Sequence, residues 1–407
     1  MDYPRMVRIR QVFDRSRIEN VEEEVTRRIR ASGVFAKVKP GARIAVTAGS
    51  RGINRVAGIL AAVIRLLREA GAEPFIIPAM GSHGGGTAAG QVVMLASLGI
   101  TEERMGVPIR SSMDTVTLGT TSSGAPVFMD RNASESDGIV VVNRVKLHTA
   151  FHGRVESGLC KMVAVGLGKK NGAETMHAYG LGAGIIEAFQ VARDTTGKIL
   201  FGAAILENAF DETCDVRIAE PSDFEAVDHE FIERCRALLP RIPLGAFDIL
   251  VVDEMGKNIS GTGMDTNIIG FWRRFGGEKV LDYHTLIVRD LTPESHGNAM
   301  GIGFADLIPR RLFEKIDLAA TYTNGIASNT WSIVRLPITL EHDRSCIETA
   351  LGKHPAGTAR VVRIRNTLSL EELSISENLT GILSGNPCIE VSGPPEPMRF
   401  GDDGTLL

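Results

Sequence analysis

Residues with reactive side chains are concentrated in the stretch 143–177 of this chain. It contains His148, His152, Lys161 and His177 among five glycines, directly after the apolar run 138–142. Such a run, followed by a polar loop, is typical of a buried strand. A packed core needs neither three histidines nor four lysines. The stretch is therefore interpreted as a functional site at the end of a strand.

His148 and His152 are four residues apart, which on a helix would suit two metal ligands. The glycine that follows favours a loop, where the alternative is one structural and one solvent-exposed histidine. Lys161 lies in an apolar context that would make its amine more nucleophilic, unless its head group reaches water. Cys160 is interpreted as a small buried residue, because nothing in the sequence pairs it with a base. His177 could reach back to the same site.

Two glycine-rich loops before this stretch suit anion binding. Gly49, Ser50 and Arg51 follow one apolar run, and Ser82 and His83 follow the next. Glycines let the backbone approach an anion, and the helix after the loop adds the positive end of its dipole. The alternatives are an ordinary strand-to-helix turn and a surface arginine. Neither loop has a Walker or a GxGxxG pattern.

A further group lies late in the chain, where Asn267, Arg273 and Arg274 accompany Asp265 and Trp272. Paired arginines beside an aromatic ring could clamp a carboxylate. The alternative is a solvated basic helix face.

The surrounding pattern predicts an α/β fold. Strands are predicted at 43–47, 73–79 and 138–142, and they alternate with helices at 54–70 and 88–98. This alternation predicts a mostly parallel sheet flanked by helices. The two glycine-rich loops and the loop after residue 142, which carry the reactive side chains, should lie at one edge of it. Residues 6–13 are predicted to form an edge strand, and the tail after residue 393 to be loose.

Length and composition limit the function classes. At 407 residues, with a proline-bearing linker at 240–245, the chain is predicted to form domains at 1–242 and 243–407. A net charge of −4 gives no basic surface for nucleic acid and no polybasic signal for membranes. Five scattered cysteines, no signal-peptide core and no apolar run of about 18 residues predict a cytoplasmic protein.

In order and spacing, these loops resemble the nickel-pincer nucleotide-dependent lactate racemase family, whose members racemise or epimerise 2-hydroxyacids. The family's Gly-Thr-His motif is similar to residues 81–83. Its Ser-Gly-Gly-Arg-Lys motif after a histidine is similar to residues 157–161 after His148. The family histidine sixteen residues past that lysine matches His177. A Thr-Arg-Pro-like loop and an Asp-x-Asn pattern are similar to residues 50–52 and 265–267.

The resemblance implies that the enzyme inverts a 2-hydroxyacid through a 2-ketoacid, by proton-coupled hydride transfer to and from a nickel-pincer nucleotide. That cofactor is pyridinium-3,5-bisthiocarboxylate mononucleotide with nickel, and cofactor-biosynthesis enzymes would supply it. His83 and His148 would be the acid–base pair, with His152 as the alternative to His148. Lys161 would anchor the cofactor, and His177 would ligate the nickel.

The resemblance also implies the remaining contacts. The cofactor would be bound by Gly49, Ser50, Arg51, Ser82, Ser157 and Gly158, and the substrate by Arg51, Asn267 and Arg273. The N-terminal domain would bind the cofactor and carry the catalysis. The C-terminal domain would close over an active site in the interdomain cleft. The resemblance does not determine whether the protein forms an oligomer.

This chain departs from the family pattern at several positions. Leu159 and Cys160 replace Gly-Arg, which leaves covalent attachment at Lys161 open. Gly270 and Arg273 replace a Gln and a Lys, so a substrate other than lactate is expected, larger if the glycine makes room. Two other classes remain. One is a metal-dependent hydrolase using the histidines, which the shortage of carboxylates beside them disfavours. The other is a non-catalytic nucleotide- or anion-binding relative.

Overall fold

The computed structural model describes residues 2–50 and 52–407, which divide into two compact units. Residues 14–239 form the N-terminal unit. Residues 240–407, together with the segment that ends at Phe13, form the C-terminal unit. The C-terminal unit thus contains residues from both ends of the chain, including its first strand.

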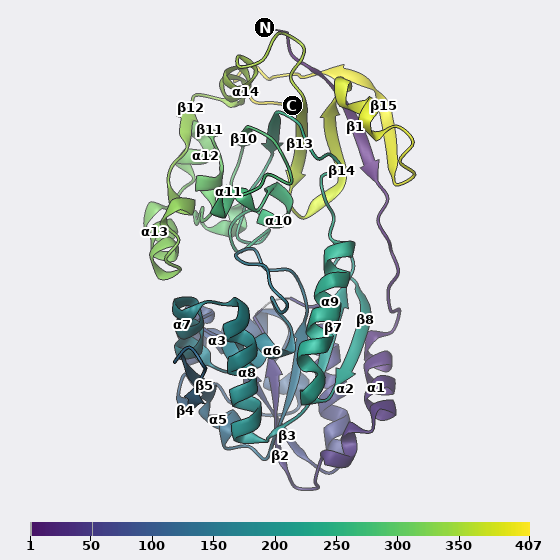
Figure 1. The fold of residues 1–407 in the computed structure, drawn as a ribbon, viewed down its shortest axis with the longest axis vertical. Helices are drawn as coiled ribbons and strands as arrows, with labels where there is room; N and C mark the ends of the chain where they lie inside the picture. Colours follow the sequence, from purple (N-terminus) through teal and green to yellow (C-terminus); the bar gives the residue numbers. More distant parts are fainter. Residues whose placement is uncertain (1, 51) are drawn as a thin grey trace. The chain divides into compact units, whose positions relative to one another are not determined.

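The N-terminal unit is built on a five-stranded sheet with the order β3-β2-β6-β7-β8 (Figure 1). The first four strands are parallel and β8 runs antiparallel to β7. The strands are β2 (Arg43–Ala48), β3 (Glu73–Pro78), β6 (Gly138–Arg144), β7 (Ile199–Glu207) and β8 (Thr213–Ala219). The predicted α/β fold with a mostly parallel sheet is therefore confirmed.

Helices cover both faces of this sheet, so alternate residues of β6 enter two different cores. Val140 and Val142 pack in the core with α1 and α2, and Ile139 and Val141 pack in the core with α8 and α9. A strand buried on both faces requires the continuous apolar run seen in the sequence. The helices are α1 (Val21–Ser32), α2 (Val56–Glu69), α3 (Ala88–Ser97), α4 (Glu102–Met105), α5 (Arg131–Ser134), α6 (Leu159–Lys161), α7 (Lys169–Tyr179), α8 (Gly182–Thr196) and α9 (Phe224–Leu238). A hairpin pairs β4 (Thr115–Thr120) with β5 (Pro126–Asp130).

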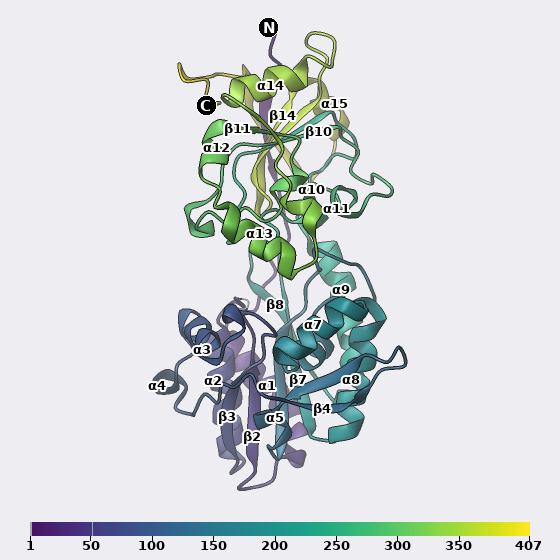
Figure 2. The same cartoon turned by 90° about the vertical axis from the view of Figure 1, so that its left-hand side faces the viewer.

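The C-terminal unit contains an eight-stranded mixed sheet with the order β12-β11-β10-β9-β13-β14-β1-β15. Figure 2 labels the strands β10, β11 and β14 of this sheet. Its strands are β1 (Arg5–Gln11), β9 (Ile249–Val252), β10 (Thr285–Val288), β11 (Leu307–Pro309), β12 (Ile338–Leu340), β13 (Val361–Asn366), β14 (Ser369–Ser376) and β15 (Ile389–Pro397). Its helices are α10 (Thr266–Ile269), α11 (Trp272–Phe275), α12 (Arg310–Glu314), α13 (Leu318–Ala327), α14 (Asp343–Leu351) and α15 (Thr380–Leu383).

Two predictions about the chain ends are wrong. The strand β1 is not at an edge, because it pairs with β14 on one side and β15 on the other. The tail is not loose, because β15 extends to Pro397 and the buried Leu406 donates its N–H to Asp343 Oδ2 at 2.9 Å. Both ends are ordered by partners far away in the sequence. Among the described residues, no helix has the length and apolar character needed to cross a membrane.

Candidate functional site

Three loops leave the carboxyl ends of β2, β3 and β6, and they lie at one edge of the sheet because these strands are parallel. They meet around the segment that starts with α6. A Cβ placed on Gly49 would lie 3.1 Å from Met162 Cε. The N–H of Gly81 donates to the carbonyl of Gly166 at 3.2 Å. The structure thus brings the three loops together, while Arg51 of the first loop lies outside the described residues.

Ser82 and His83 are exposed residues of the loop after β3, and the backbone of this loop is hydrogen-bonded to a buried side chain. Gln91 of α3 is buried, and its Nε2 donates to the carbonyls of Gly81 at 2.9 Å and His83 at 3.3 Å. The loop conformation is therefore set by one amide side chain, which leaves the imidazole at the surface of the site.

Lys169 is buried in the core and contacts the same Gln91 side chain. It opens α7 with a φ of 53° and is fully buried, as is its ion-pair partner Asp130, with Nζ 3.1 Å from Oδ2. Its Nζ also donates to Gln91 Oε1 at 3.1 Å and to the carbonyl of Pro78 at 2.5 Å. Burial lowers the pKa of Lys169 and raises the pKa of Asp130, since desolvation penalises both charged forms. A buried charge pair thus anchors the His83 loop.

The loop after β6 carries His148 and His152, and it folds around Glu156. The carboxylate of Glu156 is fully buried. Its Oε2 accepts the backbone N–H of His148 at 2.7 Å, and its Oε1 lies 3.3 Å from His152 Nδ1. Oε1 also accepts from Arg236 Nη2 at 3.2 Å and from the N–H of Gly153 at 3.3 Å. A carboxylate therefore does lie beside the histidines, contrary to expectation, which removes that argument against hydrolytic chemistry.

Lys161 lies at the end of α6, close to the same carboxylate residue. Its half-buried side chain donates from Nζ to the backbone carbonyl of Glu156 at 3.3 Å and lies 5.6 Å from the centre of the Phe151 ring. The His148 ring lies 4.6 Å from that same ring, centre to centre. The structure therefore places Lys161 and the two histidines of this loop around Phe151 and Glu156.

The start of α6 is fixed by Asp228 of α9, which accepts the N–H groups of Leu159 and Cys160, each at 2.8 Å. Asp228 is fully buried, and burial raises its pKa to about 7, while the two N–H groups act in the opposite direction. A Cβ on Gly158, which has a φ of 100°, would lie 2.1 Å from Asp228 Oδ1. Gly158 is thus required by packing, whatever it contacts in a ligand.

The neighbouring side chains have clear local roles. Ser157 Oγ donates to the carbonyl of Lys146 at 2.6 Å and accepts its N–H at 2.6 Å, which closes the base of the loop. Cys160 is fully buried, and its thiol pKa is raised by burial and by Asp228, so it is no nucleophile.

After α6 the chain forms one π-helical turn, Met162–Gly166, a distortion often found at functional sites. His177 then stands exposed on α7.

The residues proposed to contact substrate lie in the C-terminal unit. Asp265 caps α10 by accepting the backbone N–H and the side-chain amide of Asn267 at 2.8 and 2.9 Å. Arg273 is nearly buried, pairs with Asp306 at 2.7 Å and lies between the rings of Trp272 and Tyr283. It also donates to two backbone carbonyls. These contacts hold its guanidinium within its own unit, and its contact with a substrate stays a prediction.

Gly270 does not make room for a larger substrate, contrary to expectation. A Cβ at this position would lie 2.7 Å from Trp272 Nε1, and the backbone φ of 100° itself favours glycine. The space is filled by the indole, whose Nε1 donates to the carbonyl of Leu281 at 2.9 Å. Gly270 therefore serves the packing of Trp272.

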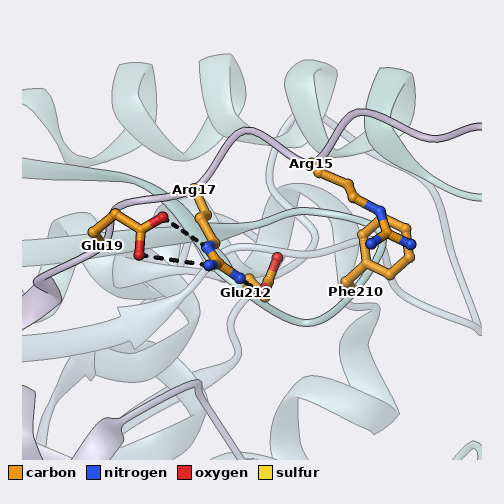
Figure 3. A pocket seen from close by; sticks show the side chains of 5 residues that line it. All are labelled: Arg15, Arg17, Glu19, Phe210 and Glu212. Atoms are coloured by element: carbon orange, nitrogen blue, oxygen red, sulfur yellow. Dashed lines mark hydrogen bonds and ion pairs between the residues drawn. The ribbon is translucent and has the colours of Figure 1, made fainter.

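A cavity of about 550 Å³ opens near the start of the N-terminal unit, and Figure 3 shows the side chains that line it. Arg17 pairs there with Glu19 and Glu212, and Arg15 lies 4.3 Å above the ring of Phe210. The carboxylates of Glu19 and Glu212 neutralise Arg17. None of the predicted catalytic or binding residues lines the cavity. The cavity therefore supports no part of the site.

Residues 7–183 match the lactate racemase N-terminal domain. Over this segment the chain is similar to the lactate racemase family. The resemblance drawn from the sequence is thereby confirmed, and such a domain indicates an isomerase of the racemase or epimerase type. The matched segment contains His83, His148, His152, Lys161 and His177, as well as Glu156 and Lys169.

No curated protein matches this chain. Among solved structures, a protein from Thermotoga maritima matches at 14% identity, over 66% of this chain and 70% of its own, with a TM-score of 0.49. The lactate racemase apoprotein from Thermoanaerobacterium thermosaccharolyticum matches at 13% identity, over 69% of this chain and 74% of its own, with a TM-score of 0.45.

Several residues that surround this candidate site were not predicted from the sequence. Glu156 is only four residues from His152, but nothing in a loop sequence shows which way a carboxylate points. Asp228 and Arg236 contact the site loop from α9, 68 and 80 residues from their partners, and no local pattern predicts such contacts. Within the described residues, no group of three or more His, Cys, Asp and Glu is arranged to hold a metal ion.

Proposed function

We propose that this protein is a racemase or epimerase of a 2-hydroxyacid that works with a nickel-pincer nucleotide. The observation that carries the proposal is the grouping of His148, His152 and Lys161 around Glu156, at a sheet edge inside the lactate racemase domain. Two imidazoles and an amine at one place are the groups that proton transfer and cofactor anchoring require.

The side chains present fit this cofactor in kind. Lys161 offers a half-buried amine at the end of α6, and His177 offers an exposed imidazole on the following helix. A nickel ion carried by an organic cofactor takes most of its ligands from that cofactor, so a single protein imidazole completes its coordination. Under the proposal, Lys161 holds one arm of the cofactor and His177 ligates the metal.

The chain's own residues would supply the proton chemistry. When bound, the cofactor would supply hydride-transfer chemistry at the α-carbon of the substrate. An imidazole of the β6 loop accepts the hydroxyl proton, and His83, on the loop after β3, serves the other side. Asn267 and Arg273 are proposed to contact the substrate, as is Arg51, which also contacts the cofactor.

The substrate is proposed to be a 2-hydroxyacid other than lactate. Gly270 and Arg273 stand where the family pattern has a Gln and a Lys, and Ala48 stands where the first loop of the family has an acid. These differences change the polar groups around the carboxylate end of a substrate. Gly270 adds no room for a larger substrate, because Trp272 fills the space beside it.

The test is to produce the protein together with cofactor-building enzymes and to measure its nickel content and intact mass. Single enantiomers of a panel of 2-hydroxyacids are then incubated with it in D₂O and separated by chiral chromatography. The expected result is bound nickel, an added cofactor mass, and an inverted product that keeps its original α-hydrogen. Incorporation of solvent deuterium at C2 would instead favour proton abstraction. Absence of nickel, of cofactor mass and of any inversion would overturn the proposal.

A second candidate is a metal-dependent hydrolase, which the buried carboxylate of Glu156 beside His152 favours, since hydrolytic sites commonly pair a carboxylate with histidine. It predicts stoichiometric zinc and hydrolysis without any cofactor mass. The same metal analysis and mass spectrum therefore separate the two functions.

A further inference from the structure

The two histidines of the β6 loop are held in different ways by their ring nitrogens. His152 Nδ1 lies 3.3 Å from Glu156 Oε1, and an ionised carboxylate can only accept, so Nδ1 carries the proton. His148 Nδ1 instead accepts the backbone N–H of Ala150 at 3.0 Å. In the neutral His148 ring the proton is therefore on Nε2. The two neutral rings are opposite tautomers.

This difference separates what the two rings can do. In this tautomer the Nε2 atom of neutral His152 has a lone pair and can accept a proton. The Nε2 atom of neutral His148 already carries a hydrogen and can only donate a hydrogen bond. Because its Nδ1 is used by Ala150, His148 can add a proton only by giving that bond up.

Glu156 is built to hold this arrangement. Its carboxylate is fully buried and receives donors from His148, Gly153 and Arg236 as well as from His152. Three N–H donors besides the imidazole, one of them a guanidinium, occupy acceptor positions on both carboxylate oxygens. Its backbone carbonyl also accepts from Lys161 Nζ at 3.3 Å. One residue therefore orients the loop, one imidazole and the amine.

We propose that Glu156 is the positioning residue of this site and that it makes His152, rather than His148, the proton carrier of the β6 loop. His152 Nε2 accepts or returns the hydroxyl proton on one side of the substrate, and His83 does so on the other side, while His148 donates a hydrogen bond from Nε2. The choice of His152 rests on the function proposed above. The tautomers and their dependence on Glu156 do not, because they are properties of the protein without cofactor.

The first experiment reads the tautomers directly by ¹⁵N–¹H NMR of the histidine rings, in protein without cofactor, at a pH where the rings are neutral. In the unmodified protein we expect His152 protonated mainly at Nδ1 and His148 mainly at Nε2. This measurement requires no folded variant. A His152 ring protonated mainly at Nε2 would overturn the proposal.

The second experiment changes the carboxylate. In Glu156→Gln, His152 is expected to lose its preference for Nδ1–H, since an amide can also donate to that nitrogen. The matched control is Glu225→Gln, which removes a half-buried carboxylate that pairs with Arg154 in the same region at 2.7 Å. The control should keep the tautomer of the unmodified protein. An unchanged tautomer in a folded Glu156→Gln variant contradicts the role of Glu156.

The third experiment uses the cofactor-loaded enzyme. His152→Gln should lower kcat about a hundredfold or more, the usual effect of losing a general base. His148→Gln should lower kcat less, and Glu156→Gln should lower kcat with little change in KM. A larger loss in His148→Gln than in His152→Gln would refute the assignment. If the unmodified enzyme inverts no hydroxyacid, the proposed function fails while the tautomer result remains independent.

Discussion

Lys169 is the residue whose burial is hardest to explain without a function. Taking an ammonium and a carboxylate out of water costs several kcal/mol for each ion, and their attraction repays this only in good geometry. Here Asp130, Gln91 and the carbonyl of Pro78 surround the ammonium group at hydrogen-bond distance. Through Gln91 this cluster holds the loop that carries His83. We interpret the pair as a device that fixes one loop of the site.

Lys169→Met should destabilise the protein by about 3–5 kcal/mol, because it leaves Asp130 as an uncompensated buried charge. The double variant Lys169→Met/Asp130→Asn should recover most of that loss. Urea unfolding measures both. The matched control is Lys170→Met, since its exposed side chain is 3.8 Å from Glu174 and should contribute little. Equal losses for Lys169→Met and Lys170→Met would show that the pair is not structural.

At the scale of elements, α6 depends on a residue from a different helix. It has only three residues, yet Asp228 of α9 satisfies two of its N-terminal N–H groups, and Gly158 allows the close approach. A segment this short has no independent stability. The position of Lys161 at its end is therefore set by tertiary contacts with α9 and by Glu156.

The pKa of Asp228, raised to about 7 from 3.8, gives the stability of this contact a pH dependence. Below about pH 4 the carboxyl is protonated in both the folded and the unfolded state, so it adds no pH dependence to the unfolding free energy. Between about pH 4 and 7 the folded state binds more protons than the unfolded state, so this contribution to the unfolding free energy falls as pH rises. Above about pH 7 the penalty is complete.

The stability difference between the unmodified protein and Asp228→Asn should therefore fall between pH 5 and pH 8. The expected fall is about 1.4 kcal/mol or more, the equivalent of one pKa unit. Urea titrations across this range measure it. The control is Asp194→Asn, because the pKa of the exposed Asp194 is lowered by Arg193 and does not titrate in this window. A difference that rises or stays level for Asp228 would contradict the raised pKa.

For the whole molecule, the first strand belongs to the sheet of the C-terminal unit. Val7 and Ile9 of β1 are buried in that unit, between β14 and β15. The lactate racemase match at residues 7–183 therefore begins in one compact unit and continues in the other. Truncation of the N-terminus is expected to harm the C-terminal sheet first.

Ile9→Ala should cost about 2–5 kcal/mol of stability, the usual effect of such a truncation in a packed core. Hydrogen exchange should increase in β14 and β15, and it should stay unchanged in β2 and β6 of the N-terminal unit. Arg8→Ala is the control, because Arg8 is an exposed residue on the same strand. Faster exchange in β2 and β6 alone would contradict the assignment of β1.

The sequence by itself determined the architecture of the N-terminal unit and the region of the site. Apolar runs and glycine loops are local signals, so the strands β2, β3 and β6 and the meeting of their loops follow from short-range patterns. The residues that resemble the family motifs were found in the same way. Their roles toward cofactor and substrate remain predictions.

Only the tertiary structure decided which groups surround those residues. It brought Asp228 and Arg236 from α9 to the site loop, and it turned Glu156 toward both histidines. It also filled the space beside Gly270 with an indole. Each of these contacts depends on the direction of a side chain or on a partner far away in the chain. Local sequence patterns cannot encode either one, because both depend on how the whole unit packs.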